Sequence, residues 1–413
     1  MQKVLSKVLS RIRPSGKERA DVKSIVDAYV RRLTDALSDA DIVVGGSIAK
    51  DTWLTNVKDA DLFVRFPQTY RGQDLSGKLE EALQIAEISY ERIHGSRDYF
   101  HATESGFLLE IVPIFFIEAA TEAENITDIS PLHVAWVKRH PDLVDDIRLA
   151  KAFAKAQEIY GAESYIQGFS GYCLEILTIV AGGFQGLLEW AASWKDREIV
   201  DPEGMHSDVM AELNASKINS PLILIDPVEA GRNVAAALSK EKFDILREKA
   251  KAFLSDPSES FFQPRDDSDD AIRRRAGKHE AYVVEVAAQE GKQDVVGCKI
   301  LKVHERIQKL IDMHGFTLVE RGWRYDGETH GRLWYIVEPQ TLPETYERMG
   351  PPLREKEAAR QFREKHPDAY ERESRLYANI SREIRRPADL FHSLGSDTVI
   401  RRRGRIHVVE LTT

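Results

Sequence analysis

The chain has 413 residues, 42% hydrophobic and 30% charged, a composition that indicates a globular protein of about two to four domains. No apolar run reaches the roughly 18 residues that a membrane span requires, and the basic N-terminal segment has no apolar stretch or cleavage site, so we expect neither membrane association nor a secretory signal. The net charge of −9 argues only weakly against a polyanionic partner, because contacts with phosphates depend on local patches.

The first 140 residues predict a small mixed sheet flanked by helices. Apolar residues recur at helical spacing from Val22 to Leu37, and later runs have the alternating or wholly apolar pattern of strands. This mixture is typical of the α+β class. The expected helices are 16–37 and 75–88, and the expected strands are 41–45, 58–66, 89–102 and 106–116.

From residue 141 the pattern becomes helical, and a second small α/β part follows it. A polar linker is expected at 255–270, where aspartate, serine and proline concentrate. The order of elements beyond the linker is β-α-β-β, followed by a charged helical stretch. The expected helices are 142–160, 170–194, 231–254, 296–314 and the stretch 353–386, and the expected strands are 281–288, 316–325 and 332–339.

The sequence thus predicts a multidomain α+β protein. We expect its four parts to span residues 1–140, 141–256, 257–345 and 346–413. Cys173 and Cys298 are the only cysteines, and neither belongs to a C-x-x-C pair. Isolated cysteines favour a reducing compartment and argue against zinc, so we expect a cytoplasmic protein.

Two carboxylates open the strand expected at 58–66. Side chains at positions i and i+2 of a strand share a face, so Asp59 and Asp61 should lie side by side. Two ionised carboxylates this close repel each other unless a cation lies between them. A lone D-x-D is more often a solvated strand edge, but an all-oxygen donor pair suits Mg²⁺, which also bridges substrate phosphates.

A glycine pair and a hydroxyl precede these aspartates. Gly45 and Gly46 allow close approach of the backbone to a phosphate, and Ser47 adds a donor. Each motif alone is weak. The ordered combination, with Thr52-Trp53 between the two motifs, predicts a nucleoside triphosphate site.

Glu110 interrupts an otherwise apolar strand, FLLEIVPIFF at 107–116. A buried, unpaired carboxylate would be costly, so it is either protonated, exposed, paired with an arginine, or a third metal ligand facing Asp59 and Asp61. Three carboxylates and two Mg²⁺ would form a site for in-line displacement at phosphorus.

Together with later blocks, these motifs resemble the polymerase-β nucleotidyltransferase superfamily and, more narrowly, the archaeal-type (class I) CCA-adding tRNA nucleotidyltransferases. GFSGY and DPV…RNVAA carry the narrower resemblance, whereas D-x-D marks only the superfamily. The matching blocks are the stretch 46–66, LEIVP at 109–113, SPLH at 130–133, RLAK at 148–151, IYGAE at 159–163, GFSGY at 168–172, DPV at 226–228, RNVA at 232–235 and RMGP at 348–351.

The resemblance implies a catalytic head, a helical neck, an α/β body and a helical tail. It implies addition of C, C and A to the 3′ end of tRNA from CTP and ATP, without a template, with two Mg²⁺ as cofactor. The acceptor stem and elbow of tRNA would lie on the body and tail, and a homodimer is possible. Asp59, Asp61 and Glu110 fall on the metal-ligand positions, and the nucleotide-binding positions correspond to Gly46, Ser47, Lys50, Ser130, His133, Lys151, Tyr160 and Arg232.

The residues themselves support some of these roles. Lys151 lies beside an apolar helical stripe, so its ammonium either seeks an anion or extends to the surface. Arg232 could read a base edge or a phosphate, or pair with Asp226 or Glu229 at the start of a helix. Tyr160 and His133 alone would be assigned to the core or to an interface. Asp51 stands where the family has a small or neutral turn residue, and we expect it to add negative charge near the phosphates.

One helix offers a surface for RNA. Lys299, Lys302, Arg306 and Lys309 share one face of the helix at 296–314, which is either simply solvated or contacts the tRNA backbone. The alternatives to CCA addition are a poly(A) polymerase, an oligoadenylate synthase-like enzyme, or an inactive RNA-binding relative. An intact carboxylate set argues against the last.

Overall fold

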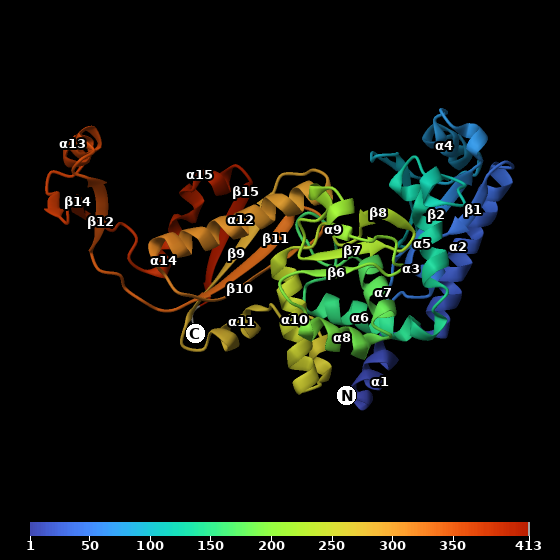
Figure 1. Ribbon diagram of the computed structural model, residues 1–413, viewed down its shortest axis with the longest axis horizontal. Coiled ribbons are helices and arrows are strands. Elements are labelled where there is room, and N and C mark those ends of the chain that lie inside the picture. Colours follow the sequence, from blue (N-terminus) through green and yellow to red (C-terminus); the bar gives the residue numbers. More distant parts are fainter. Residues whose placement is uncertain (412–413) are drawn as a thin grey trace. The chain divides into compact units, whose positions relative to one another are not determined.

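The computed structural model describes residues 1–411, and the chain divides into two compact units, Met1–Arg265 and Asp266–Thr413 (Figure 1). The first unit begins with a five-stranded sheet in the order β1-β2-β5-β4-β3, in which β2 and β5 are parallel and all other pairs antiparallel. Its strands are β1 (Asp41–Val44), β2 (Asp59–Phe66), β3 (Glu91–Ile93), β4 (Tyr99–Glu104) and β5 (Phe107–Phe115).

Helices cover one face of this sheet, where its core lies. Helix α2 lies against β1, and the other helices here are α3, α4 and α5. Ser15 and Glu18 form a capping box that starts α2. Leu33, Leu62 and Leu83 are fully buried, and burying each such side chain stabilises the fold by about 2 kcal/mol. The helices are α2 (Gly16–Ala36), α3 (Gly46–Lys50), α4 (Leu75–Ile85) and α5 (Ser130–Val137).

The rest of the first unit is mainly helical, and the N-terminal helix packs on it. Leu5 and Val8 of α1 join the same apolar cluster as Phe153 and Phe184. A small sheet, β6-β7-β8, completes this part. Its elements are α1 (Gln2–Ile12), α6 (Val144–Ala156), α7 (Gly171–Val180), α8 (Phe184–Ser193), β6 (Glu198–Val200), α9 (Val209–Glu212), β7 (Leu222–Asp226), β8 (Glu229–Asn233) and α10 (Lys240–Ser255).

The expected helix at 170–194 is broken in two. Gly182 and Gly183 adopt φ of +71° and +129°, which only glycine adopts readily, and α7 and α8 meet at 91°. Within residues 1–411 no single helix is long and apolar enough to cross a membrane; α7 and α8 meet that test only together, as a bent pair.

The helix expected at 231–254 begins later, at Lys240. Residues 229–233 instead form β8, which turns back on β7. Asn233 fixes this hairpin, because its amide accepts from Leu224 N at 3.0 Å and donates to Lys217 O at 2.8 Å. These long-range bonds overcome a helical apolar spacing.

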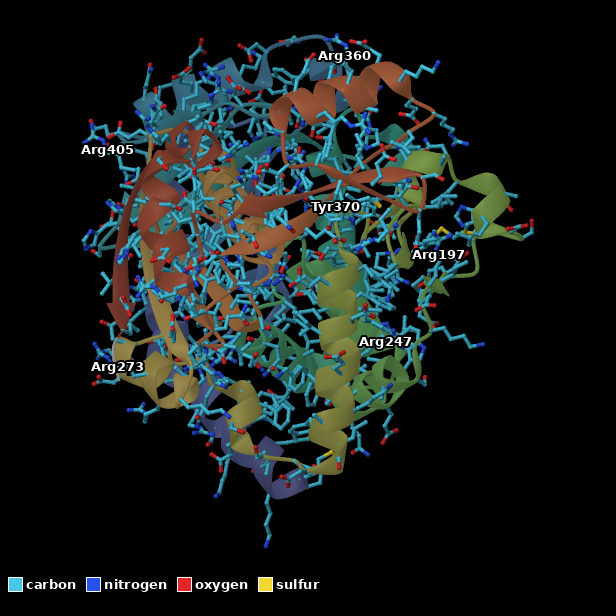
Figure 2. All side chains as sticks on the ribbon, turned by 90° about the vertical axis from the view of Figure 1, so that its left-hand side faces the viewer. Arg197, Arg247, Arg273, Arg360, Tyr370 and Arg405 are labelled. Atoms are coloured by element: carbon cyan, nitrogen blue, oxygen red, sulfur yellow. The ribbon has the colours of Figure 1, made fainter. Side chains whose placement is uncertain are left out.

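The second unit contains a four-stranded antiparallel sheet in the order β10-β11-β9-β15, with α12 lying across it. Ile300, Val303 and Ile307 of α12 are fully buried in its core. The edge strand β15, which carries Arg405 (Figure 2), was not predicted. The elements are α11 (Asp269–Ala276), β9 (Glu280–Ala288), α12 (Gln293–His314), β10 (Leu318–Tyr325), β11 (His330–Val337), α14 (Pro387–Ser393), α15 (Thr398–Arg401) and β15 (Gly404–Leu411).

A small three-stranded sheet, β12-β14-β13, carries helix α13 in the same unit. The helical stretch expected at 353–386 was wrong beyond Lys365, because the residues that follow form two strands. Tyr370, labelled in Figure 2, stacks on Tyr377 across these strands with 6.1 Å between the ring centroids. The elements are β12 (Thr345–Pro352), α13 (Lys356–Lys365), β13 (Tyr370–Arg372) and β14 (Arg375–Ser381).

Candidate active site

The three predicted carboxylates lie on two neighbouring parallel strands. Asp59 and Asp61 open β2, and Glu110 lies on β5. The register pairs Asp61 directly with Glu110, so both side chains project from the same face of the sheet. Of the alternatives left open for Glu110, the strand register favours an acid that faces Asp59 and Asp61, and the residue is half-buried.

Gly46 makes room for the Asp61 carboxylate. A Cβ atom at Gly46 would lie 1.7 Å from Asp61 Oδ2, and the residue has a φ of +56°. Gly45 is equally tight, because its Cβ would lie 2.0 Å from the Phe63 ring. The two glycines thus allow the backbone before α3 to pass directly over β2, and Gly45 N donates to Asp61 O at 2.8 Å.

Burial and neighbouring carboxylates disfavour the ionised forms of Asp61 and Glu110. Burial, followed by the charges of Glu110 and Asp59, raises the pKa of Asp61 to about 6, although Lys50 opposes the shift. Burial and Asp59 also raise the pKa of Glu110, against the opposing effect of His101. Mutual repulsion of this kind is relieved when a cation binds between carboxylates.

We expect Asp61→Asn to stabilise the metal-free protein above pH 6. Asp61 binds a proton more tightly folded than unfolded, so the wild type loses stability as pH rises from about 4 to about 6. The variant should lack this loss and be more stable by about 2 kcal/mol at pH 7.5, as measured by urea unfolding in EDTA. Mg²⁺ should raise the wild-type midpoint and leave the variant's unchanged. Equal pH profiles for the two proteins would contradict the assignment.

His101 lies on the other side of Glu110 and was missed in the sequence. It pairs with Glu110 in the β4–β5 register, and its Nε2 lies 3.5 Å from Glu110 Oε2. The side chains of Asp61, Glu110 and His101 therefore form one row across three strands. Only knowledge of the strand pairing could have revealed this histidine.

The donor set fits a divalent metal ion in part. Among residues 1–411, no three His, Cys, Asp or Glu side chains converge into a complete metal site. Asp61 and Glu110 face each other in register, the pKa values of these two acids are raised, and the absence of a side chain at Gly46 leaves room for the Asp61 carboxylate. Asp59, Asp61 and Glu110 could thus hold such an ion only with further oxygens from a ligand, as a bound triphosphate would provide.

Lys50 and Lys151 meet at one buried carboxylate that was not predicted. Lys50 Nζ lies 2.6 Å from Glu175 Oε2, and Lys151 Nζ lies 2.7 Å from Glu175 Oε1. Thr52 donates to the same carboxylate at 2.6 Å. Lys151 was expected either to seek an anion or to extend to the surface. The structure supports the first alternative, because its side chain is buried and paired with Glu175.

A second lysine, one turn further along α6, borders the carboxylates. Lys155 Nζ lies 4.9 Å from the Tyr160 ring centroid. Partial burial lowers the pKa of Lys155, against the opposing effect of Asp59. Burial raises the pKa of Tyr160, with Glu175 and Asp59 adding to that shift. The i, i+4 spacing from Lys151 was the available signal for Lys155. Ser47 lies in the first turn of α3 and Ser130 begins α5, which contacts α3.

His133, Tyr172 and Arg232 converge on Asp226. Burial lowers the pKa of His133, and Asp226 only partly opposes this. The pKa of Asp226 is also lowered, because His133 and Arg232 outweigh its burial, so a neutral His133 donates to an ionised Asp226 across 2.9 Å. Tyr172 donates at 3.1 Å and Arg232 at 3.0 Å. Arg232 therefore forms the expected ion pair with Asp226, although it lies on strand β8 and not at the start of a helix. About a third of its side chain (32%) is still exposed.

Asp51 does not act as a bare charge near the phosphates, contrary to our expectation. Its carboxylate accepts from Arg19 at 2.6 Å and lies 2.9 Å from the Arg148 guanidinium. Arg148 is itself buried and also donates to Trp53 O at 3.1 Å. Two cations therefore neutralise Asp51, which ends α3 in a left-handed conformation.

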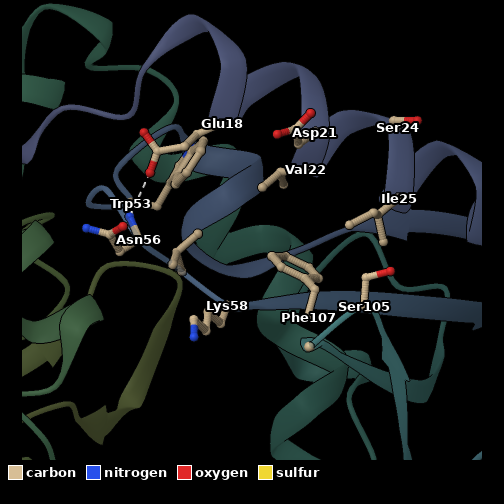
Figure 3. Close-up of a pocket in the computed structure, with 12 residues that line it drawn as sticks. Glu18, Asp21, Val22, Ser24, Ile25, Trp53, Asn56, Lys58, Ser105 and Phe107 are labelled. Carbon is tan, nitrogen blue, oxygen red and sulfur yellow. Dashed lines mark hydrogen bonds between the residues drawn. The ribbon is translucent and has the colours of Figure 1, made fainter.

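A hollow of about 600 Å³ lies beside the segment that leads into β2 (Figure 3). Glu18 fixes that segment, since it accepts from Asn56 N at 2.8 Å and from Thr55 Oγ1 at 2.7 Å. The bond from Asn56 is the main cause of the lowered pKa of Glu18, about 2. Helix α2 thus holds the turn that places Asp59.

Comparison with known proteins is consistent with this geometry. Three family models match successive parts of the chain: a nucleotidyltransferase domain at residues 26–129, the second domain of tRNA nucleotidyltransferase at 145–263, and the C-terminal domain of CCA-adding enzyme at 279–399. The CCA-adding enzyme of Nanoarchaeum equitans is 34% identical over 89% of this chain and 91% of its own length. The chain belongs to the CCA-adding enzyme family. That of Methanoregula boonei is 31% identical over 93% of this chain and 84% of its own.

Solved structures of other nucleotidyltransferases share the fold of this CCA-adding enzyme family member. The Cid1 poly(U) polymerase with Mg and 3′-dATP bound aligns with a TM-score of 0.51 at 19% identity, over 64% of this chain and 98% of the other. The predicted family and the α+β, polymerase-β-like fold class are thereby confirmed.

The basic helix face of this CCA-adding enzyme is only partly free of partners. Lys302 and Lys309 are exposed and Lys299 is half-buried. Arg306 instead pairs with Asp397, with an N–O distance of 2.8 Å. All four predicted cations thus face solvent at least in part, but Arg306 is engaged by a carboxylate.

Proposed function

We propose that this CCA-adding enzyme adds C, C and A to the 3′ end of tRNA from CTP and ATP, one nucleotide at a time and without a template. The observation that supports this most strongly is the pairing of Asp61 with Glu110 beneath Gly46, within a chain whose family is established. The 3′ hydroxyl oxygen of the tRNA attacks the α-phosphorus. The bond from that phosphorus to the bridging oxygen breaks, and pyrophosphate leaves.

The residues of this chain have separate roles in that reaction. Asp59, Asp61 and Glu110 form the acidic row that would hold two Mg²⁺ ions, which supply charge neutralisation and acidify the attacking hydroxyl. Gly46, Ser47, Lys50, Ser130 and Lys151 surround the triphosphate. Tyr160 and Lys155 border its sugar-proximal end, and His133 and Arg232 contact the base. Neutral His133, donating to Asp226, leaves Arg232 as the charged donor there.

The division of labour along the chain is part of the proposal. The predicted parts are a catalytic head at 1–140, a neck at 141–256, a body at 257–345 and a tail at 346–413. Two segments are better grouped otherwise: α1 packs with the neck, and α14, α15 and β15 share the sheet and core of the body, which leaves β12, α13, β13 and β14 as the tail. The body and tail would bind the acceptor stem and elbow of tRNA. A cytoplasmic location agrees with the two free cysteines. The protein is further proposed to form a homodimer, which sedimentation would test.

A product assay tests the function directly. The pure protein is incubated with tRNA ending at position 73, Mg²⁺ and each nucleotide, and the products are sequenced. We expect addition that stops at CCA. Runs of A would instead identify a poly(A) polymerase, short 2′-linked oligomers an oligoadenylate synthase-like enzyme, and no Mg²⁺-dependent incorporation an inactive RNA-binding relative.

We expect tRNA affinity to fall steeply with salt, despite the net charge of −9. Each phosphate neutralised by a lysine adds about 0.7 to 0.9 to the slope of log K against log salt. Replacing Lys299, Lys302 and Lys309 with Gln should lower that slope by about 2 in filter-binding titrations. The double variant Lys249→Gln, Lys251→Gln on α10 is the control and should be compared with the double variant Lys302→Gln, Lys309→Gln, which removes the same number of charges. An unchanged slope in the triple variant would remove α12 from the tRNA interface.

A further inference from the structure

Glu175 is a fully buried carboxylate to which the proposed reaction assigns no role. It lies on α7, in the helical part of the first unit, and has no exposed surface. Its two oxygens take three donors: Lys50 at the end of α3, Lys151 on α6, and the Thr52 hydroxyl. Glu175 therefore connects the segment that carries the glycine pair to two helices distant in the sequence.

The charges in this cluster do not balance. Two ammonium groups meet one carboxylate, which leaves one positive charge in a place with little access to water: the side chains of Lys50 and Lys151 are 9% and 4% exposed. The surplus agrees with the lowered pKa of Lys151, which burial causes first and which Lys50 increases against the opposing effect of Glu175. A buried surplus charge is costly unless an anion joins it.

The cluster lies close to the carboxylate row. Lys50 is the last residue of α3, one helical turn after Gly46, and Gly46 packs directly against Asp61 Oδ2. Lys50 also lies 5.3 Å from the ring centroid of Tyr172, whose hydroxyl donates to Asp226 of the proposed base site. An anion bound between the carboxylate row and the base site would meet this surplus positive charge. A nucleoside triphosphate has its phosphates at one end and its base at the other, so it could reach both sites.

We propose that Glu175 is a positioning residue for the triphosphate: by holding Lys50 and Lys151 on one carboxylate, it fixes two ammonium groups in a preformed cationic floor for the incoming nucleotide. This inference rests on the proposed function. Glu175 itself touches neither substrate nor metal. Preformed charge lowers the ordering cost of binding, so its loss should weaken nucleotide binding rather than the chemical step.

The test is Glu175→Gln, which keeps the shape of the side chain and removes its charge. We expect the KM for CTP to rise by about tenfold or more, with kcat and the KM for tRNA changed by less than about threefold. Equilibrium dialysis of CTP with Mg²⁺, without tRNA, should show the same loss. Leu177→Ala, which creates a cavity on the same helix, is the matched control: it should lower the melting temperature and leave the KM for CTP unchanged.

A double variant separates positioning from simple stability. Glu175→Gln combined with Lys151→Met removes both partners of the buried pair and should restore much of the lost melting temperature, because no surplus charge is added. Its KM for CTP should remain high. An unchanged KM in Glu175→Gln, or a KM that recovers together with stability in the double variant, would overturn the inference. A wild type that binds CTP but incorporates nothing would instead overturn the proposed function, since dialysis still reports on Glu175.

Discussion

Replacing Asp61 with alanine should abolish nucleotide incorporation while the protein stays folded. Asp61 is central in the acidic row, between Asp59 on its own strand and Glu110 on the next. Its removal deletes the donor with the most strongly raised pKa and leaves two acids that no longer flank a shared position. We therefore expect a loss of about a thousandfold or more in kcat/KM, because the metal ions supply charge stabilisation to the transition state.

The measurement is single-turnover addition of CMP to tRNA ending at position 73, with circular dichroism as the test of folding. Asp21→Asn serves as the matched control and should retain full activity, because Asp21 is an exposed residue of α2 that borders the hollow in Figure 3 and belongs to neither the carboxylate set nor the nucleotide site. Dialysis should show that the Asp61 variant still binds tRNA. More than a few per cent of wild-type activity would refute the placement of the catalytic centre on β2.

Replacing Gly46 with alanine should be nearly as damaging, although it removes no functional group. The added methyl would overlap Asp61 Oδ2, since the two atoms would be 1.7 Å apart, and the backbone at φ +56° disfavours any side chain. Asp61 must then turn away from Glu110. We expect at least about a hundredfold loss of kcat/KM, with more of the loss in kcat than in the KM for CTP.

A second glycine distinguishes the two causes of this effect. Gly182 also has a positive φ, +71°, but a Cβ there would meet nothing within 4 Å. Gly182→Ala therefore carries the backbone strain without the collision, and it should cost about 1 kcal/mol of stability and little activity, by urea unfolding and the same assay. If both glycine variants lose activity equally, backbone strain rather than the Asp61 carboxylate explains the loss.

The two halves of the acidic row were predictable to different degrees. The alternation of side chains along a strand was enough to place Asp59 and Asp61 together, because that is a local property. The pairing of Asp61 with Glu110 depends on a parallel register between strands about 50 residues apart, which no local pattern fixes. The resemblance to a family supplied that link. His101, which lies next to Glu110 through the separate antiparallel pairing of β4 with β5, was not found.

Charge partners were the least predictable feature. A buried Lys151 was expected to seek an anion, but the sequence could not name Glu175, which comes from another helix. Asp51 was expected to add negative charge near the phosphates. Its two partners, Arg19 and Arg148, lie 32 and 97 residues away in the chain, so no local pattern could reveal them. The prediction of a helix across the residues of β8 was wrong for a related reason. The strand is held by hydrogen bonds to β7, and the helical spacing of its apolar residues does not reveal them.

The edge strand β15 has a consequence for the order in which the protein forms during synthesis. The first unit uses only residues up to 265, so its cores can close while translation continues. The sheet of the second unit cannot: β9, at residue 280, waits for β15, whose last residue is 411. Until then β9 presents an unpaired edge, which invites pairing with other chains. A truncation before residue 404 would make that transient exposure permanent, and the truncated product should aggregate or be degraded even though it retains every proposed catalytic residue.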